Sequence, residues 1–181
     1  MTQDTNTSSG PDPEPGTDSS TEAGAAANAD LGPDAPSSQS AGTVEARRLL
    51  SEALEADRRG ETEVARRRYE EALELNPTDP EIRTAWGRAL MTRARHREAE
   101  VVLRALCEED PGQVEAHRVL GEVLHRMGGD ADALEVLERA AELDPGHPRP
   151  WYLMGLVHDG AGRPEQAAAM YRRSRERTAS R

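Results

Sequence analysis

The stretch VEAHRVLGEVLHRMGGDADALEVLERAAELDPGH, residues 114–147, contains two helical patterns separated by a turn. Apolar residues recur at the spacing of one helix face before the GGD triplet, and again after it. Gly128 and Gly129 predict the turn, and Asp130 is the expected N-cap of the second helix. The stretch therefore predicts a helical hairpin. The two apolar stripes consist of Val119, Leu120, Val123, Leu124 and Met127, and then of Ala133, Leu134, Leu137, Ala140 and Ala141.

The same organisation recurs along the chain with a period of 34 residues. Cutting at this period gives four units, residues 46–79, 80–113, 114–147 and 148–181. Small residues are expected where the two helices of a unit approach closely, and a proline is expected to stop the second helix. The residues that repeat at this interval are Pro77, Pro111 and Pro145; Ala65, Ala99, Ala133 and Ala167; and Gly87, Gly121 and Gly155.

The joints between units share the same turn chemistry. At the first joint Asp79 is the expected cap and Pro80 the expected first helical residue, and Pro164 is placed likewise within the last unit. The joint AELDPGHPRPW, residues 141–151, looks at first like a loop built around a histidine. His147 occupies the repeat position of Asp79, so we interpret it as a capping or solvent-facing residue.

The repeat resembles the tetratricopeptide repeat, whose signature is Trp-x2-Leu-Gly-x2-Tyr in the first helix, then Ala-x3-Phe and Pro over 34 residues. The fourth unit carries the first part as Trp151, Met154 and Gly155, with a histidine in the place of the tyrosine. The first helix of unit one departs from the signature, with Glu52 in place of Leu and Ala53 in place of Gly.

The resemblance covers residues 46–181 and implies an all-α fold, a right-handed superhelix of four stacked helix-turn-helix units, or α-solenoid. It also implies that the first helices line a concave groove that usually holds a segment of a partner protein. Four positions on each first helix should face this groove, and together they carry four arginines and five acids. The partner-binding residues predicted there are Arg88, Arg118, Glu122, Arg149, Tyr152 and Leu156.

Two interpretations of the groove arginines stay open at this point. Arg88, Arg118 and Arg149 either hold carboxylates of the partner in bidentate fashion or pair with glutamates of their own surface, namely Glu81, Glu115 and Glu122. Tyr152 with Leu156 is the expected apolar anchor. Leu50 with Leu54 is a further candidate, unless Glu52 marks a rotated helix whose leucines face the core.

Composition and motifs argue against several other classes of protein. Hydrophobic residues make up 35% of the chain and none is phenylalanine, which suits closely packed helices built from Leu, Ala and Val. The histidines do not share one repeat position, and we expect no metal site, no cofactor and no enzymatic activity. The single Cys107 is the expected small hydrophobe of a helix. The absence of lysine, with arginine supplying all basic side chains, suggests a bacterial protein from a GC-rich genome.

The net charge of −11 lies mostly in the first 45 residues, which contain acids and no base. A slightly acidic body argues against nucleic acid as a partner. The sequence has no apolar run long enough for a membrane span and no signal-peptide pattern, so we expect no membrane association and a cytoplasmic location. At the other end, the Arg-rich segment YRRSRERTASR is either a solvated helix cap or a small basic docking patch.

Residues 1–42 are rich in Ser, Thr, Pro, Gly, Ala and Asp, and we predict a disordered acidic tail before a repeat domain of residues 43–181. The tail is either a solubilising extension or a segment that docks on a partner or on the body. We interpret the whole chain as a protein–protein interaction module, an adaptor or scaffold that binds a protein segment in its groove. The alternative is a self-associating structural or regulatory homo-oligomer assembled through a terminal repeat.

Overall fold

The two helical patterns of each unit form two helices in the computed structural model, which describes residues 38–179. Most of the predicted acidic tail lies outside these residues. The described segment forms eight helices joined by short turns. They are α1 (Ser38–Arg58), α2 (Thr62–Leu75), α3 (Pro80–Thr92), α4 (His96–Glu109), α5 (Val114–Arg126), α6 (Asp130–Leu143), α7 (Pro148–Gly160) and α8 (Pro164–Ala179).

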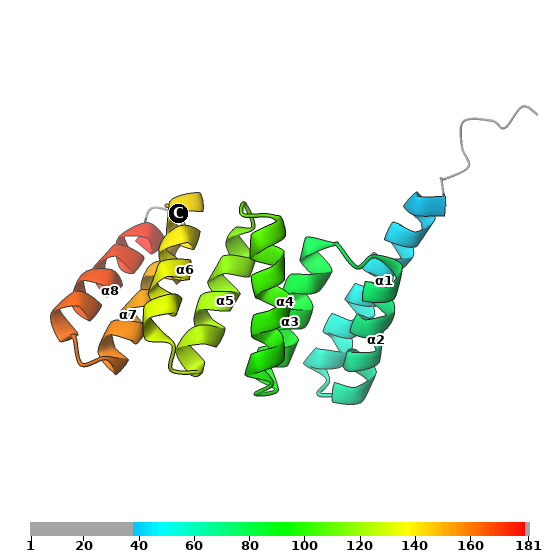
Figure 1. Cartoon of the computed structure of the whole chain (residues 1–181), viewed down its shortest axis with the longest axis horizontal. Helices are drawn as coiled ribbons and strands as arrows, with labels where there is room; N and C mark the ends of the chain where they lie inside the picture. Colours follow the sequence, from blue (N-terminus) through cyan, green and yellow to red (C-terminus); the bar gives the residue numbers. More distant parts are fainter. Residues whose placement is uncertain (1–37, 180–181) are drawn as a thin grey trace, which may run out of the picture. The chain divides into compact units, whose positions relative to one another are not determined.

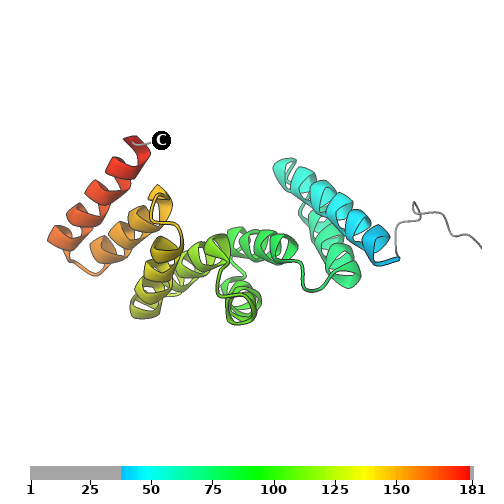
Figure 2. The same ribbon diagram turned by 90° about the horizontal axis from the view of Figure 1, so that it is seen from above.

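Each predicted unit corresponds to one helical hairpin, and the four hairpins stack in chain order (Figure 1). The first helix of each hairpin contacts the second helix of the preceding hairpin, and α1, α3, α5 and α7 also contact one another in sequence. The first hairpin packs least closely on its neighbour, and it stands apart from the other three when the stack is turned by 90° (Figure 2). The fold is therefore an all-α solenoid.

Glycines allow the two helices of a hairpin to approach closely, as the repeat pattern predicted. A Cβ atom on Gly87 would lie 2.6 Å from Cγ of Leu103, and one on Gly121 would lie 2.5 Å from Cγ of Leu137. Gly155 faces the ring of Tyr171 in the same way. A methyl group at these positions would therefore require the facing side chain or its helix to shift. The alanines that recur early in each second helix are buried with exposed fractions of 0–1%.

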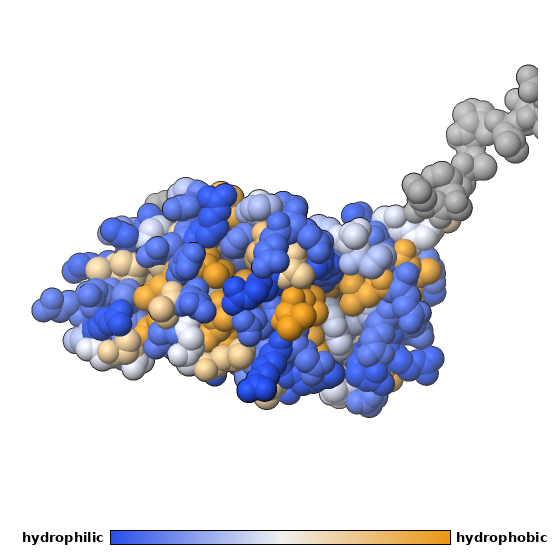
Figure 3. Space-filling model, in the orientation of Figure 1, coloured by the Kyte–Doolittle hydropathy of each residue, from blue (hydrophilic) through white to orange (hydrophobic). Residues whose placement is uncertain are grey.

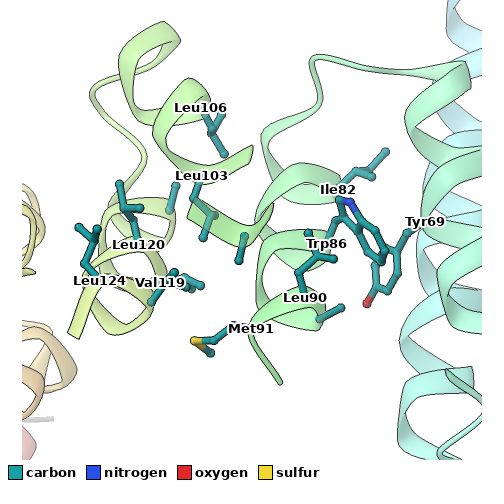
Figure 4. Packing of buried hydrophobic residues seen from close by; sticks show 14 of the residues in the cluster. Tyr69, Ile82, Trp86, Leu90, Met91, Leu103, Leu106, Val119, Leu120 and Leu124 are labelled. Atoms are coloured by element: carbon teal, nitrogen blue, oxygen red, sulfur yellow. The ribbon is translucent and has the colours of Figure 1, made fainter. Parts of the chain in front are cut away.

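Leucine, alanine and valine fill the core, with aromatic rings at the first junction. The rings of Tyr69 on α2 and Trp86 on α3 lie 5.2 Å apart between centroids, which joins the first hairpin to the second (Figure 4). Further along the stack, Leu103 packs with Val119 and Leu120 between α4 and α5 (Figure 4). This core is continuous over the described hairpins.

Most helix ends follow the predicted chemistry. The second helices α2, α4 and α6 each end two residues before the repeating proline. The side chain of Asp79 caps α3 by accepting hydrogen bonds from the backbone N–H groups of Glu81 at 2.9 Å and Ile82 at 3.3 Å. His147 caps α7, since its Nδ1 accepts a hydrogen bond from the N–H of Arg149 at 3.2 Å. Both predicted capping roles are confirmed.

The prediction that Asp130 caps α6 is wrong. Gly129 occupies the cap position, and Asp130 is the first residue of the helix. Its Oδ1 lies 2.9 Å from Nδ1 of His125 on the preceding helix. The carboxylate therefore bridges the turn instead of accepting hydrogen bonds from the backbone of its own helix.

Helix α1 shows why the first unit departs from the signature. It begins at Ser38, inside the segment that the sequence assigned to the tail. Leu50 is buried, so it belongs to the core. Glu52 is half-exposed and forms ion pairs with Arg48 at 2.6 Å and Arg68 at 3.0 Å. A charged residue is tolerated there because no earlier hairpin of the described chain packs against this side.

Hydrophilic side chains cover most of the face seen in Figure 3, with separate apolar patches between them. Among residues 38–179 no helix combines the length and the apolar character that crossing a membrane requires.

Candidate functional site

Helices α3, α5 and α7 bring most of the predicted groove residues to one cavity of about 420 Å³, which we call the central cavity. The helices are consecutive first helices of the stack and contact one another, so residues at matching repeat positions become neighbours. Four arginines and two glutamates dominate its wall. These residues are Arg88, Glu115, Arg118, Glu122, Arg126 and Arg149.

Glu115 joins α3 to α5 through two arginines. Arg118 donates to it in bidentate fashion, from Nε to Oε2 at 2.8 Å and from Nη2 to Oε1 at 2.6 Å. Arg88 donates from Nη2 to Oε1 at 2.5 Å. Burial acts to raise the pKa of Glu115, but the hydrogen bonds from Arg118 and the charges of Arg118 and Arg88 outweigh it and lower the pKa. Glu115 therefore remains a carboxylate.

Glu122 is the second carboxylate that pairs with several arginines, and it links α5 to α7. It accepts hydrogen bonds from Arg126 at 2.9 Å and from Arg118 at 3.4 Å, and Nη2 of Arg149 lies 3.8 Å from its Oε2. The side chain of Glu122 is only 12% exposed. A buried carboxylate needs such partners, because an unpaired charge in a dry environment is costly.

The arginines of the central cavity differ in how many of their N–H donors are used within the protein. Arg118 is 11% exposed and contacts both glutamates, so its donors are largely used within the protein. Arg88, Arg126 and Arg149 are 47%, 46% and 51% exposed, and each contacts a single carboxylate among the described residues. A guanidinium has five N–H donors, so these three side chains, which we call the rim arginines, have donors left for a ligand.

The groove arginines pair with glutamates of their own surface, and three of them still have donors for the carboxylates of a partner. The arginines do pair with glutamates of their own surface, but with Glu115 and Glu122; within the described residues Glu81 forms no ion pair. Four arginines surround two glutamates, so the central cavity keeps an excess of positive charge.

A second cavity of about 520 Å³ lies where the first hairpin meets the second, and we call it the first-junction cavity. Leu54, Tyr69, Ala85 and Ala89 contribute apolar surface to its lining. Arg88 and Thr92 line both cavities, so the two adjoin across α3.

The acidic group of the first-junction cavity is already engaged. Oδ2 of Asp57 accepts a hydrogen bond from the hydroxyl of Tyr69 at 2.9 Å, and its Oδ1 accepts one from Nη2 of Arg93. The cavity therefore offers a ligand apolar surface together with the N–H donors of its arginines. Among the described residues, Nε and Nη1 of Arg93 are buried and have no hydrogen-bond partner. Leu54, a candidate anchor in the sequence, lies here half-buried, whereas Leu50 lies in the core.

The structure does not bring Tyr152 and Leu156 into either cavity. The ring of Tyr152 lies 5.7 Å from that of Tyr171 on α8, and the guanidinium carbon of Arg149 lies 5.8 Å from its centre. Tyr152 is 41% exposed and Leu156 is half-buried against the core. Tyr152 and Leu156 therefore lie on α7 outside both cavities, and the ring of Tyr152 is next to Arg149.

Arg126 lines the central cavity and was not among the groove residues predicted from the sequence. It follows Glu122 by four residues, and that spacing places two side chains on the same helix face. This spacing indicates a shared face, although Arg126 lies one position beyond the last of the four predicted groove positions of its helix. His147, interpreted only as a cap, also lines the central cavity.

Other reactive groups have structural roles. Burial raises the pKa of the Cys107 thiol to about 11, which keeps it protonated and unreactive near neutral pH. In the described part of the chain, no cluster of His, Cys, Asp and Glu side chains could hold a metal ion.

Comparisons with known proteins identify the repeat. Family models described as tetratricopeptide repeat match residues 84–148 and residues 131–180. The human protein "Tetratricopeptide repeat protein 7B" is 37% identical over 93 residues, which is 51% of this chain and 11% of that protein. The chain spans about a tenth of the length of the curated human relatives that it matches.

Solved structures show the same fold. The crystal structure of MamA aligns with a TM-score of 0.66 at 21% identity and covers 75% of this chain and 79% of that chain. TTC0263, described as a thermophilic TPR protein in Thermus thermophilus, aligns with a TM-score of 0.65 at 24% identity. That match covers 71% of this chain and 72% of the other.

Proposed function

Because the chain belongs to the tetratricopeptide repeat family, whose fold serves protein–protein interaction, we propose that it is a cytoplasmic adaptor or scaffold without catalysis of its own. Its partner is a segment of another protein, which lies along the first helices α3, α5 and α7. The single observation that carries this proposal is the gathering of three half-exposed rim arginines around one cavity.

The chemistry of the two cavities supports an extended segment as the ligand. The rim arginines provide charge-assisted hydrogen bonds for carboxylates, and such bonds are stronger than neutral ones. The first-junction cavity provides room for an apolar side chain beside them. Because Arg88 lines both cavities, one segment crossing α3 reaches both kinds of contact. Tyr152 and Leu156 extend the proposed surface along α7.

The test is an affinity purification from the native cell with a triple charge reversal, Arg88→Glu, Arg126→Glu and Arg149→Glu. Arg118 and Glu122 are left unchanged because they hold the cavity together. The matched control reverses three exposed arginines of second helices, Arg67, Arg104 and Arg139. The rim variant should lose partners that the wild type and the control both retain. Identical partner lists for all three proteins would refute groove binding.

The alternative function is self-association through a terminal repeat. Light scattering over a concentration series separates it from the adaptor function. A mass that rises with concentration in the wild type and in the rim variant alike would favour the oligomer, since the contact would then not involve the central cavity. A constant monomer mass would exclude it.

A further inference from the structure

The first-junction cavity contains hydrogen-bond donors that the protein does not use. Arg93 lines the cavity with a side chain that is 16% exposed, and its Nη2 donates to Asp57. Its Nε and Nη1 are buried and have no hydrogen-bond partner among the described residues. Most buried donors in folded proteins are paired, because an unpaired one loses its hydration without compensation. An acceptor that reaches Arg93 through the cavity would supply this missing interaction.

The place of Arg93 in the fold makes its donors reachable. Arg93 is the C-cap residue of α3, and its side chain crosses the junction to Asp57 in the last turn of α1. Protein atoms cover its Nε and Nη1, so a ligand meets them when the side chain turns towards the cavity. The first hairpin packs on the second less closely than the later hairpins pack on one another, and the cavity lies beside the side chain. Such a turn therefore has room.

The charge of the cavity lining favours an anion. Arg58, Arg88 and Arg93 line the cavity, and Asp57 is the one acidic lining residue in the described part of the chain. Arg58 and Arg88 are 70% and 47% exposed, and each pairs with a glutamate that is not part of the lining. A guanidinium has five N–H donors, so all three arginines keep donors for a further acceptor. A carboxylate in the cavity would therefore meet three cations and one competing acid.

The remaining lining is largely apolar and requires more than a charge from the ligand. Leu54, Tyr69, Ala85 and Ala89 contribute this surface. The volume of about 520 Å³ has room for a large aliphatic side chain together with a neighbouring carboxylate. Because Arg88 also lines the central cavity, the occupant lies in the path of a segment that binds along the first helices. A protein segment with adjacent apolar and acidic residues fits all of these features.

We propose that the first-junction cavity binds a motif of the partner segment in which an acidic residue stands next to a large apolar one. This inference rests on the proposed adaptor function and names the chemistry of one of its anchors. The apolar side chain contacts Leu54 and Tyr69, and the carboxylate accepts hydrogen bonds from Arg93. The bound motif touches both hairpins, so its binding holds the first hairpin on the stack.

The test measures binding to the full chain by fluorescence anisotropy at low salt. The probe is a fluorescein-labelled peptide, Ser-Gly-Ser-Glu-Leu-Glu-Ser-Gly-Ser, amidated at its C-terminus so that its carboxylates are those of the two glutamates. One matched peptide has glutamine in place of both glutamates, and another has serine in place of leucine. The wild type should bind the first peptide about tenfold more tightly than either matched peptide. No binding, or no preference for glutamate or for leucine, would overturn the proposal.

Arg93→Met removes the donors and keeps much of the side-chain volume. It should weaken binding of the glutamate peptide about tenfold and leave that of the glutamine peptide unchanged. The matched control is Arg83→Met, since Arg83 is similarly buried but pairs with Glu109 inside the second hairpin. The control should alter neither affinity. Equal weakening of both peptides by Arg93→Met would show that Arg93 only supports the fold, and the proposal would fail.

Asp57→Asn provides a gain of binding, which a misfolded protein would not show. The side chain of Asp57 competes with the ligand for Arg93 and repels a second carboxylate. Its neutralisation should therefore strengthen binding of the glutamate peptide about threefold, with little effect on the glutamine peptide. Unchanged or weaker binding of the glutamate peptide would contradict the assignment of the carboxylate to Arg93.

Hydrogen exchange locates the bound peptide. At saturation, the glutamate peptide should slow the exchange of backbone amides in α1 and α2, because it bridges the first hairpin to α3. Amides of α6 should exchange at the same rate with and without it. Bound peptide that leaves α1 and α2 unprotected would place the site elsewhere and overturn the proposal.

A further variant separates this inference from the adaptor function. Arg126→Glu with Arg149→Glu changes the central cavity alone, because neither residue lines the first-junction cavity, and it should retain the peptide. If it loses the peptide while Arg93→Met keeps it, the motif belongs to the central cavity and the inference fails, whereas the adaptor function stands. If the peptide binds as expected but the triple rim variant keeps every cellular partner, the adaptor function fails and the first-junction site stands.

Discussion

At the scale of single residues, Ala94 has a left-handed backbone conformation, which favours glycine. Its φ is 58°, while Gly60, Gly128 and Gly162 have φ values of 74°, 81° and 68° at the same repeat position. The N–H of Arg95 donates to the carbonyl of Leu90 at 3.0 Å, which closes the end of α3 around this left-handed residue. A side chain in that conformation costs about 1–2 kcal/mol.

Replacing Ala94 by glycine should therefore stabilise the protein by roughly 0.5–1 kcal/mol. Relief of the left-handed strain exceeds the added flexibility of the unfolded chain, which costs about 0.4–1 kcal/mol. Urea unfolding followed by circular dichroism measures the change. Ala168→Gly, at an exposed position in the interior of α8, is the matched control and should lose about 1 kcal/mol. A destabilised Ala94→Gly variant would contradict the argument.

Tyr171 should make the stability of the fold depend on pH. Burial and then its hydrogen bond to Asp159, 2.7 Å long, raise the pKa of Tyr171 to about 12. The ordinary value in the unfolded chain is about 10. Because the folded state favours the protonated phenol, this stabilisation is complete below about pH 10 and is lost as the pH rises towards about 12.

The difference in unfolding free energy between wild type and Tyr171→Phe should therefore be constant from about pH 7 to about pH 9 and shrink above about pH 10. Tyr69, whose pKa is also raised by burial and by Asp57, is present in both proteins and cancels in the difference. Urea titrations at a series of pH values measure it. A difference that does not change up to about pH 11.5 would show that the phenol of Tyr171 is not held in its protonated form.

At the scale of helices, the joints between successive hairpins differ in how the N-terminus of the following helix is capped. Asp79, Gln113 and His147 occupy the same repeat position before α3, α5 and α7. The side chains of Asp79 and His147 accept hydrogen bonds from the backbone of the following helix, whereas that of Gln113 does not. The start of α3 therefore depends on its cap more than the start of α5 does.

Asp79→Ala should lower the free energy of unfolding by about 1 kcal/mol, because two backbone N–H groups lose their acceptor. Asp79→Asn should retain most of the stability, since asparagine caps almost as well. Gln113→Ala, at the equivalent joint, should change it by less than about 0.5 kcal/mol. Equal losses at the two joints, measured by urea unfolding, would mean that the cap is not the cause.

The helices were predictable because their signals are local. Apolar spacing, turn glycines and prolines act within a few residues, so they fixed the four hairpins and the end of each second helix. Asp130 was misjudged because its carboxylate has two local choices, the backbone of α6 and the ring of His125. Sequence spacing does not reveal which choice has the better geometry.

At the scale of the whole molecule, the candidate site was predictable only in part. The prediction that Arg88, Arg118 and Arg149 lie on one surface followed from their similar repeat positions. In a regular solenoid, residues at matching repeat positions are neighbours in space. The choice of Glu115 over Glu81 as their partner depends on the stacking of α3 against α5. The first-junction cavity depends on how loosely one hairpin packs on the next, and no local pattern encodes that packing.

That loose packing implies uneven stability along the stack. Contacts from Asp57 and Tyr69 of the first hairpin to Arg93 and Trp86 of the second hold this junction together. A solenoid's stability is roughly the sum of its units and their interfaces, so a weak interface lets the terminal hairpin open separately. Backbone amides of α1 and α2 should exchange hydrogen faster than those of α5 and α6.

Arg93→Met tests whether the contact across the junction limits this opening. It removes the ion pair to Asp57 and keeps much of the side-chain volume, so exchange should accelerate in α1 and α2 while α5 and α6 stay unchanged. Arg83→Met is the matched control, because Arg83 is similarly buried but pairs with Glu109 inside the second hairpin. The control should affect α3 and α4 instead. Hydrogen exchange read by mass spectrometry separates the two patterns, and equal acceleration along the whole stack by Arg93→Met would show that the four hairpins open as one unit.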